Sequence, residues 1–171
     1  MNGEQLLKER LSRNWEQQDA ATKLKVSQPY LSLIEAGKRR VTTKLARRAT
    51  QVFKLSPTAL PIELQSKSSG AKAENLLASQ LAALDYPKFS HLKKSKRVNP
   101  AAVLISALKE DELDSRIVEA LPWLIFKFAE MDWLQVINSA KLSDSQNRLG
   151  FLASLAYDLA KQSKNENNVG L

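Results

Sequence analysis

Residues 26–40, VSQPYLSLIEAGKRR, decide the fold of the first third of the chain. Ser27 is a good helix N-cap, and Pro29 is tolerated in a first turn because the N–H that proline lacks has no intrahelical partner there. Leu31 and Ile34 have the spacing of one buried helix face, and the glycine that follows is a typical C-cap. The segment therefore predicts a short helix with polar and aromatic groups on its first turn and a basic loop after its end.

Other short helical segments surround this one. Residues 4–13 carry leucines at helical spacing, residues 16–26 form a second segment, and residues 42–54 follow a threonine cap. Ser56 and Pro57 stop the last of these, and one more short turn follows them. Five short helices within residues 1–64 predict a compact all-helical domain.

The rest of the chain also predicts helices. Residues 65–75, QSKSSGAKAEN, are rich in Ser, Lys and Gly and have little to bury, which indicates a linker. Residues 76–163 show helical apolar patterns and no strand-like alternation of useful length, whereas residues 164–171 are expected to form a disordered tail. The expected fold is all-α, with a five-helix domain over residues 1–64 and a second small helical domain.

Within this second domain, several residues set the expected helix ends. Asn99 is expected to cap one helix, Pro122 to begin another, and Ser143 with Gln146 to form a capping box for the last. Gly150 is expected at a close helix crossing, with a partner contact as the alternative. The large aromatic residues are expected in the core, with an aromatic-lined ligand pocket as the alternative; they are Trp123, Phe126, Phe128, Trp133 and Phe151.

Charge is unevenly distributed along the chain, which has a net charge of +8. Residues 1–60 hold twelve Lys and Arg against five Asp and Glu, whereas residues 99–171 hold seven against ten. The sequence does not indicate a role for a second basic run, residues 88–97, KFSHLKKSKR. A basic head and a mildly acidic tail predict a polyanionic partner at one end and a different kind of partner at the other.

Composition argues against several classes of protein. Cysteine is absent and His91 is the only histidine, so thiolate sites, a histidine metal cluster and a histidine-based triad are excluded. The acidic run 110–114, EDELD, is interpreted as a solvated helix boundary rather than an acid/base or metal pair. No apolar run suits a membrane span and the start does not resemble a secretion signal, which favours a cytoplasmic protein. We therefore expect no cofactor, no bound metal, no membrane contact and no enzymatic activity.

A helix that enters the DNA major groove reads base edges with its first turns. Gln28 can pair bidentately with adenine and Tyr30 offers a ring for a thymine methyl, and the full set of candidate base contacts is Gln28, Pro29, Tyr30 and Ser32. Cations beside the groove add affinity without sequence information. The candidate phosphate contacts are Gln17, Ser27, Lys38, Arg39, Arg40 and Lys44. Gln28 and Tyr30 taken alone are equally well explained as exposed helix residues, and residues 37–40, GKRR, taken alone are most often a solvated loop. Together with the concentrated positive charge, these residues favour DNA.

Residues 4–60 resemble the helix-turn-helix domain of the Cro/C1 (XRE) class of bacterial and phage regulators, in register from Arg10 through WEQQDAATKLKVSQPYLSLIEAGKR. The resemblance implies a five-helix, lambda-repressor-like fold. It also implies DNA contacts at Gln17 and Gln28 and an internal ion pair between Arg10 and Glu35. Two positions depart from the family pattern, because Ala20 replaces a larger aliphatic residue and Lys25 replaces the usual turn glycine. A lysine at positive φ costs about 1 kcal/mol, so the turn is expected to be slightly altered.

The expected function is a sequence-specific DNA-binding repressor that acts as a homodimer on a pseudo-palindromic operator, with half-sites about 34 Å apart. Residues 119–160 resemble the tails of regulators from toxin–antitoxin and phage-defence operons. This implies, as a narrower hypothesis, an antitoxin that represses its own operon and neutralises a toxin through the second domain. The alternatives are a phage or metabolic regulator whose second domain senses a ligand, and an enzyme with a DNA-targeting domain.

Overall fold

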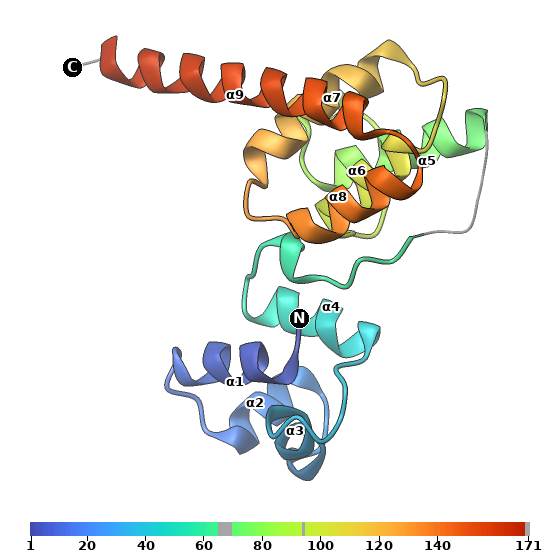
Figure 1. Ribbon diagram of the computed structural model, residues 1–171. Helices are drawn as coiled ribbons and strands as arrows, with labels where there is room; N and C mark the ends of the chain where they lie inside the picture. The colour runs from blue at the N-terminus through green and yellow to red at the C-terminus, as the bar shows by residue number, and fades with distance from the viewer. Residues whose placement is uncertain (65–69, 94, 170–171) are drawn as a thin grey trace. The chain divides into compact units, whose positions relative to one another are not determined.

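The computed structural model describes residues 1–64, 70–93 and 95–169 of the chain. All regular structure in these residues is helical, and the chain divides into two compact units, Met1–Pro61 and Ile62–Leu171 (Figure 1). The all-α class predicted from the sequence is confirmed for the described residues.

The first unit contains four α-helices: α1 (Gly3–Leu11), α2 (Gln17–Leu24), α3 (Gln28–Glu35) and α4 (Thr43–Val52). The expected fifth helix is a single 3-10 turn, η1 (Pro57–Ala59). α3 packs against α1 and α2, and α4 packs against α2. Their shared core contains Leu6, Ala20, Ala21, Leu24, Leu31, Ile34, Leu45, Ala49 and Phe53.

Side-chain caps fix where these helices begin and end. The Ser27 hydroxyl accepts the N–H of Tyr30 at the start of α3, and the Thr42 hydroxyl accepts the N–H of Leu45 at the start of α4. Gly37 follows α3 with φ +72°, a left-handed conformation that glycine adopts without strain. The predicted boundaries of these two helices therefore rest on local hydrogen bonds.

Lys25 ends α2 in the left-handed conformation, with φ 53° and ψ 48°. Its N–H donates to the carbonyl oxygens of Ala21 and Thr22, so the turn closes although the family's usual glycine is absent. The lysine Cβ is disfavoured at this backbone angle, whereas glycine has no such penalty. The sequence led us to expect an altered turn. The structure shows a strained backbone conformation at Lys25, whereas the hydrogen bonds that end the helix are ordinary.

Replacing Lys25 with glycine is expected to raise the free energy of unfolding of the first unit by about 1 kcal/mol. The matched control is Lys23→Gly inside α2, which is expected to lower it by about 1 kcal/mol because glycine is a poor helix former. Urea unfolding, with amide hydrogen exchange to assign the change to the first unit, measures both effects. A loss of stability in Lys25→Gly would contradict the strain assigned to this residue.

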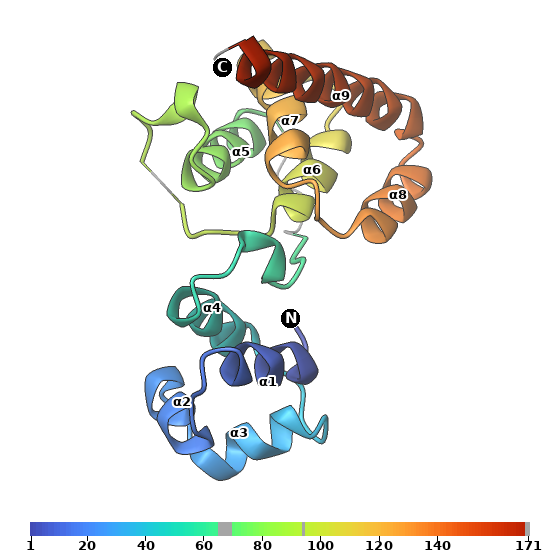
Figure 2. The same ribbon diagram turned by 90° about the vertical axis from the view of Figure 1, so that its left-hand side faces the viewer.

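The second unit is built from α5 (Ala71–Ala83), the 3-10 turn η2 (Pro87–Phe89), α6 (Pro100–Leu108), α7 (Ser115–Lys127), α8 (Trp133–Leu142) and α9 (Gln146–Val169). α6 is central and buried on nearly all sides, which fits its almost wholly apolar sequence. α7 and α9 lie along each other, and α6 packs against α5, α7 and α8 (Figure 2). No helix in the described part of the chain is both long and apolar enough to cross a membrane.

Two predicted boundaries of this unit differ from the structure. α5 begins at Ala71, so the linker prediction is wrong for residues 71–75, and residues 65–69 lie outside the described residues. Alanine has the highest helix propensity, and Ala73 becomes buried when the helix begins early. α9 continues to Val169, into the predicted disordered tail, because adding residues to an existing helix is far easier than starting one.

α7 differs from its prediction because Pro122 lies inside the helix rather than at its start. A proline inside a helix costs about 3 kcal/mol, because it removes one hydrogen bond and its ring meets the preceding turn. Burial of Ile117, Leu121 and Leu124 offsets this, since each such side chain contributes about 1.5–3 kcal/mol. The packing of the whole helix therefore overrides the local signal of the proline.

Three further expectations for this unit are wrong. Ser143 ends α8, where its hydroxyl donates to the Ser139 carbonyl, so it does not form the predicted capping box. A Cβ added at Gly150 would meet no atom within 4 Å, so this glycine does not lie at a close helix crossing. Phe126 and Phe151 are 41% and 63% exposed and are not core residues, whereas Phe128 is buried.

The basic run 88–97 is partly neutralised by acidic residues of the same unit. Lys88 Nζ lies 2.7 Å from Glu119 Oε2, and Arg97 Nη2 lies 3.0 Å from Asp85 Oδ2. Both pairs are well exposed, so each contributes little to stability. Lys88 is thereby paired with α7 and Arg97 with the turn after α5.

Candidate nucleic-acid interface

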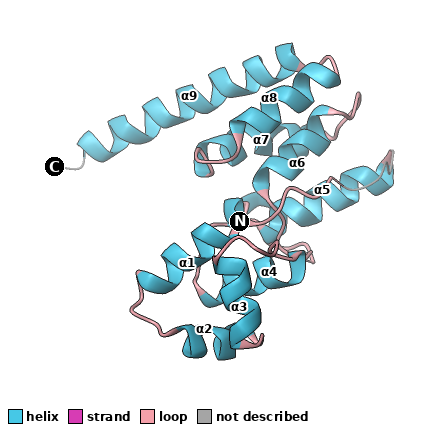
Figure 3. Ribbon diagram, turned by 60° about the horizontal axis from the view of Figure 1, so that its bottom comes forward, coloured by secondary structure: helices cyan, strands magenta, loops and turns pink. Residues whose placement is uncertain are grey.

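α2 and α3 lie next to each other, joined by the turn that contains Lys25 (Figure 3). Leu31 and Ile34 are fully buried and anchor α3 from behind. Pro29 and Leu33, one turn apart, are exposed on the opposite side of the helix. This arrangement holds α3 rigidly while its outer face stays accessible.

A chain of hydrogen bonds links the first turn of α3 to the other helices of the unit. Gln28 Nε2 donates to Gln17 Oε1, and Gln17 Nε2 donates to Glu35 Oε2 at 2.9 Å. Arg10 then binds Glu35 through both oxygens, at 2.8 Å from Nε and 3.0 Å from Nη2. Arg10 Nη1 also donates to the Trp15 carbonyl at 2.9 Å. Gln28 is therefore held by residues from three helices.

Glu35 determines which groups donate and which accept along this hydrogen-bond chain. The Glu35 carboxylate only accepts hydrogen bonds, so Gln17 must turn its amide nitrogen toward Glu35 and its oxygen toward Gln28. Gln28 then uses one of its two amide N–H groups on Gln17, and its Oε1 and second N–H are left over. Adenine presents an N6 donor and an N7 acceptor in the major groove, and this remaining donor and acceptor pair suits that edge.

The ion pair at the end of this chain is nearly buried. The side chains of Arg10 and Glu35 are 12% and 5% exposed. The hydrogen bond that Arg10 donates to Glu35 raises the pKa of Arg10, while partial burial opposes this shift more weakly. The expected Arg10–Glu35 pair is present, and because its charge is compensated internally, Glu35 does not present an unpaired negative charge beside the candidate DNA-binding helix.

The loop after α3 carries three exposed cations, Lys38, Arg39 and Arg40. The backbone N–H groups of Lys38 and Arg39 donate to the Leu33 carbonyl, at 2.8 and 3.1 Å, which ties the loop to the end of the helix. The Arg39 guanidinium lies 5.8 Å from the centre of the Tyr30 ring. The loop that carries the three positive charges is therefore anchored to the C-terminal end of α3.

The other residues that were predicted to contact DNA differ in how far they are buried. Tyr30 is half-buried and its ring packs against the hydrophobic core, which favours its hydroxyl over its ring face as the group that meets DNA. Ser27 is exposed while capping α3, Ser32 is half-buried, and Lys44 is exposed on the first turn of α4. The structure brings Gln17 and Gln28 together directly, and no hydrogen bond among the described residues joins Lys44 to them.

The structure adds Leu33, which is not among the predicted base contacts, to the candidate surface. Leu33 is 38% exposed on the same side of α3 as Pro29. An apolar side chain at this place suits the methyl group of thymine. The four-residue spacing from Pro29, on the side opposite Leu31, was the signal in the sequence that indicated it.

Comparison with known families agrees with this geometry. The sequence model of the Helix-turn-helix family matches residues 6–60. Comparisons with curated proteins and with solved structures give no match. Residues 6–60 are a Cro/C1-type helix-turn-helix domain, and the chain carries the DNA-binding domain of a transcription regulator.

Proposed function

We propose that the chain is a sequence-specific transcriptional repressor that reads base edges with the first turn of α3. The observation that carries this proposal is the hydrogen-bond chain from Arg10 through Glu35 and Gln17 to Gln28. If Gln28 were only a solvent-exposed side chain without a binding role, contacts from three helices would not be needed to orient its amide group. Such preorganisation lowers the ordering cost of binding and favours one base over the others.

A homodimer on a pseudo-palindromic operator is the binding mode that we propose, with half-sites about 34 Å apart. Selection of bound sequences from random duplexes by the full chain tests this, together with sedimentation of the protein–DNA complex. The expected result is a two-fold related motif bound by two copies, and a reporter repressed when that motif overlaps its promoter. Recovery of sequences with no shared motif would contradict the proposal.

Replacing Arg39 with alanine is expected to weaken binding to every DNA sequence by a similar factor. Arg39 is an exposed cation in the loop after α3, so we assign it to a phosphate. Removing one phosphate contact also reduces the slope of log affinity against log salt concentration by about 1. Titration of the selected operator and of an unrelated duplex at several salt concentrations measures both quantities.

Lys8→Ala is the matched control, because Lys8 is an exposed cation of the same unit on α1. We expect its salt slope to equal that of the unchanged protein. A loss confined to the operator in Arg39→Ala, with an unchanged salt slope, would show that Arg39 reads a base instead.

Autoregulation and neutralisation of a toxin form a narrower second candidate. The observation in its favour is the exposed apolar face of α8, where Leu134 is 73%, Ile137 42% and Leu142 90% exposed. Large apolar side chains on a surface often mark a protein contact, and the net acidic charge of residues 99–171 suits a basic partner. Co-expression of the full chain with the product of the adjacent gene tests this, with Leu134→Ser and Leu142→Ser expected to abolish co-purification. Absence of both a complex and a growth rescue would contradict it.

A further inference from the structure

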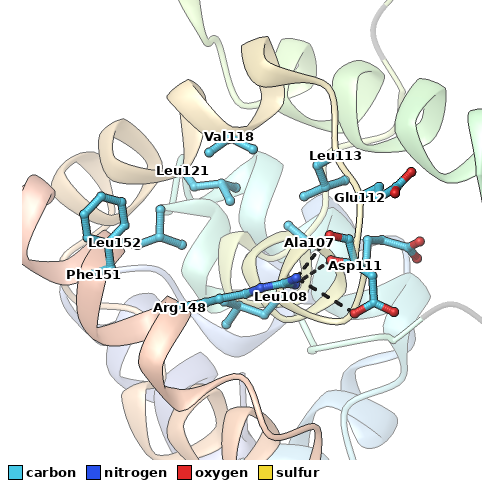
Figure 4. A pocket seen from close by; sticks show the side chains of 11 residues that line it. Ala107, Leu108, Asp111, Glu112, Leu113, Val118, Leu121, Arg148, Phe151 and Leu152 are labelled. Carbon is cyan, nitrogen blue, oxygen red and sulfur yellow. Dashed lines mark hydrogen bonds and ion pairs between the residues drawn. The ribbon is translucent and has the colours of Figure 1, made fainter.

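The second unit contains a pocket of about 400 Å³ between α7, α9 and the loop that joins α6 to α7. Figure 4 shows Phe151 and Leu152 on one side of it, Leu113 and Glu112 on the other, and Val118 and Leu121 between them. This volume lies within the range of pockets that hold small molecules in proteins. The pocket has no part in the DNA-binding surface of the first unit.

The walls of the pocket are mostly aliphatic. Leu108 comes from the end of α6, Leu113 from the loop, Val118 and Leu121 from α7, and Leu152 from α9. Leu121 and Leu152 are buried, whereas Val118 is 41% exposed, so the lining continues from the core to the surface. An apolar body of a ligand is therefore suited to this space.

The charged residues around the pocket are mainly acidic. Glu110, Asp111 and Glu112 follow one another in the loop, and Arg148 is the one basic residue in the lining. Arg148 donates to the backbone carbonyls of Glu110, at 2.6 Å, and of Asp111, at 3.1 Å. The Arg148 guanidinium is therefore directed at the loop backbone, and it lies 3.8 Å from the exposed Asp111 carboxylate.

The carboxylates of Glu110 and Glu112 form no ion pair among the described residues. The lining thus keeps an excess of negative charge, which attracts a cation and repels an anion. Phe151 adds an aromatic ring that is 63% exposed at the edge of the pocket. This ring lies across the pocket from Glu112, so it extends the apolar wall, while the carboxylates at the opposite rim favour a cationic group over an anionic one.

We propose that this pocket binds a small organic cation with an apolar body, such as a hydrophobic quaternary or tertiary amine. The aliphatic walls and Phe151 hold the apolar body, and the negative charges of Glu110 and Glu112 at the opposite rim attract the cationic head. The proposal does not depend on the DNA-reading role of α3, because binding can be measured on the protein without DNA.

Isothermal titration of the full chain with three matched probes tests the proposal. The probes are 4-phenylbutyltrimethylammonium, neutral 4-phenylbutanol and anionic 5-phenylpentanoate, which all carry one phenylbutyl group and differ in the charge of the head group. The cation is expected to bind most tightly and the anion most weakly, with a difference of about ten-fold or more between them. No saturable binding of the cation, or equal binding of the three probes, would overturn the proposal.

The variants replace the exposed residues Phe151 and Glu112 and the half-buried Glu110, so that folding is retained. Phe151→Ala is expected to weaken binding of all three probes, and the double variant Glu110→Gln/Glu112→Gln is expected to weaken binding of the cation alone, each about three-fold or more. The matched controls are Tyr157→Ala, because Tyr157 is also 63% exposed on α9, and Asp158→Asn on the same helix. Equal losses in the controls and in the pocket variants would place the binding elsewhere and overturn the assignment.

Discussion

Replacing Arg10 with methionine is expected to lower the free energy of unfolding of the first unit by about 3–5 kcal/mol. The change leaves the carboxylate of Glu35, which is only 5% exposed, without its charged partner. It also removes the hydrogen bond to the Trp15 carbonyl. Urea unfolding measures the loss, and amide hydrogen exchange of α1 to α4 assigns it to this unit.

Two comparisons separate the buried charge from the loss of packing. Lys8→Met on the same helix removes an exposed cation and is expected to change stability by less than about 0.5 kcal/mol. Adding Glu35→Gln to Arg10→Met is expected to restore part of the lost stability, because no uncompensated charge then remains inside the unit. A double variant less stable than Arg10→Met alone would show that the uncompensated charge is not the cause.

Replacing Gln28 with alanine is expected to weaken operator binding by about 1–3 kcal/mol and to relax the preference for adenine at one position of each half-site. The physical reason is the loss of a donor and acceptor pair that Gln17 holds toward the DNA side. Binding to unrelated duplexes is expected to change little, because phosphate contacts are untouched. Titration of the operator and of all three single-base replacements at that position measures the effect.

Gln18→Ala is the matched control, because Gln18 is an exposed glutamine beside Gln17 on α2. It has no part in the hydrogen-bond chain, and its operator affinity and base preference are expected to stay unchanged. If Gln28→Ala lost the same affinity on every sequence, Gln28 would be a backbone contact.

Local signals in the sequence predicted the first unit well. Ser27 and Thr42 cap helices through hydrogen bonds to residues three positions away, and Gly37 ends a helix through its own backbone angle. These effects are short in range, so sequence spacing alone indicates them. The strain at Lys25 was expected for a different reason, because the resemblance to the Cro/C1 class places this lysine where that class has a turn glycine.

Tertiary packing explains where the predictions for the second unit were wrong. Pro122 looked like a helix start, and only the burial of the whole α7 face reveals that the helix passes through it. Phe151 looked like a core residue, yet it lies at the edge of a pocket because the walls from α6, α7 and the loop meet beside α9. Local sequence patterns do not predict how segments that are far apart in the chain pack against one another.

The candidate interface was predictable in part. The identities of Gln17, Gln28, Arg10 and Glu35 followed from residue types and from the resemblance to the Cro/C1 class. Their joining into one hydrogen-bond chain depends on the approach of three helices, and so does the orientation of the Gln28 amide. Residue type already indicated adenine as the base for Gln28, and the structure adds which donor and acceptor of its amide are left to pair with that base.

The coupling between Gln28 and a single atom of adenine tests this account most directly. A double-mutant cycle compares the full chain and Gln28→Ala on the selected operator with adenine and with 7-deazaadenine, which lacks the N7 acceptor, at the assigned position. We expect a coupling free energy of about 1 kcal/mol or more, because losing N7 weakens the unchanged protein and leaves the variant unaffected. Equal losses for both proteins at every adenine of the operator would contradict base reading by Gln28.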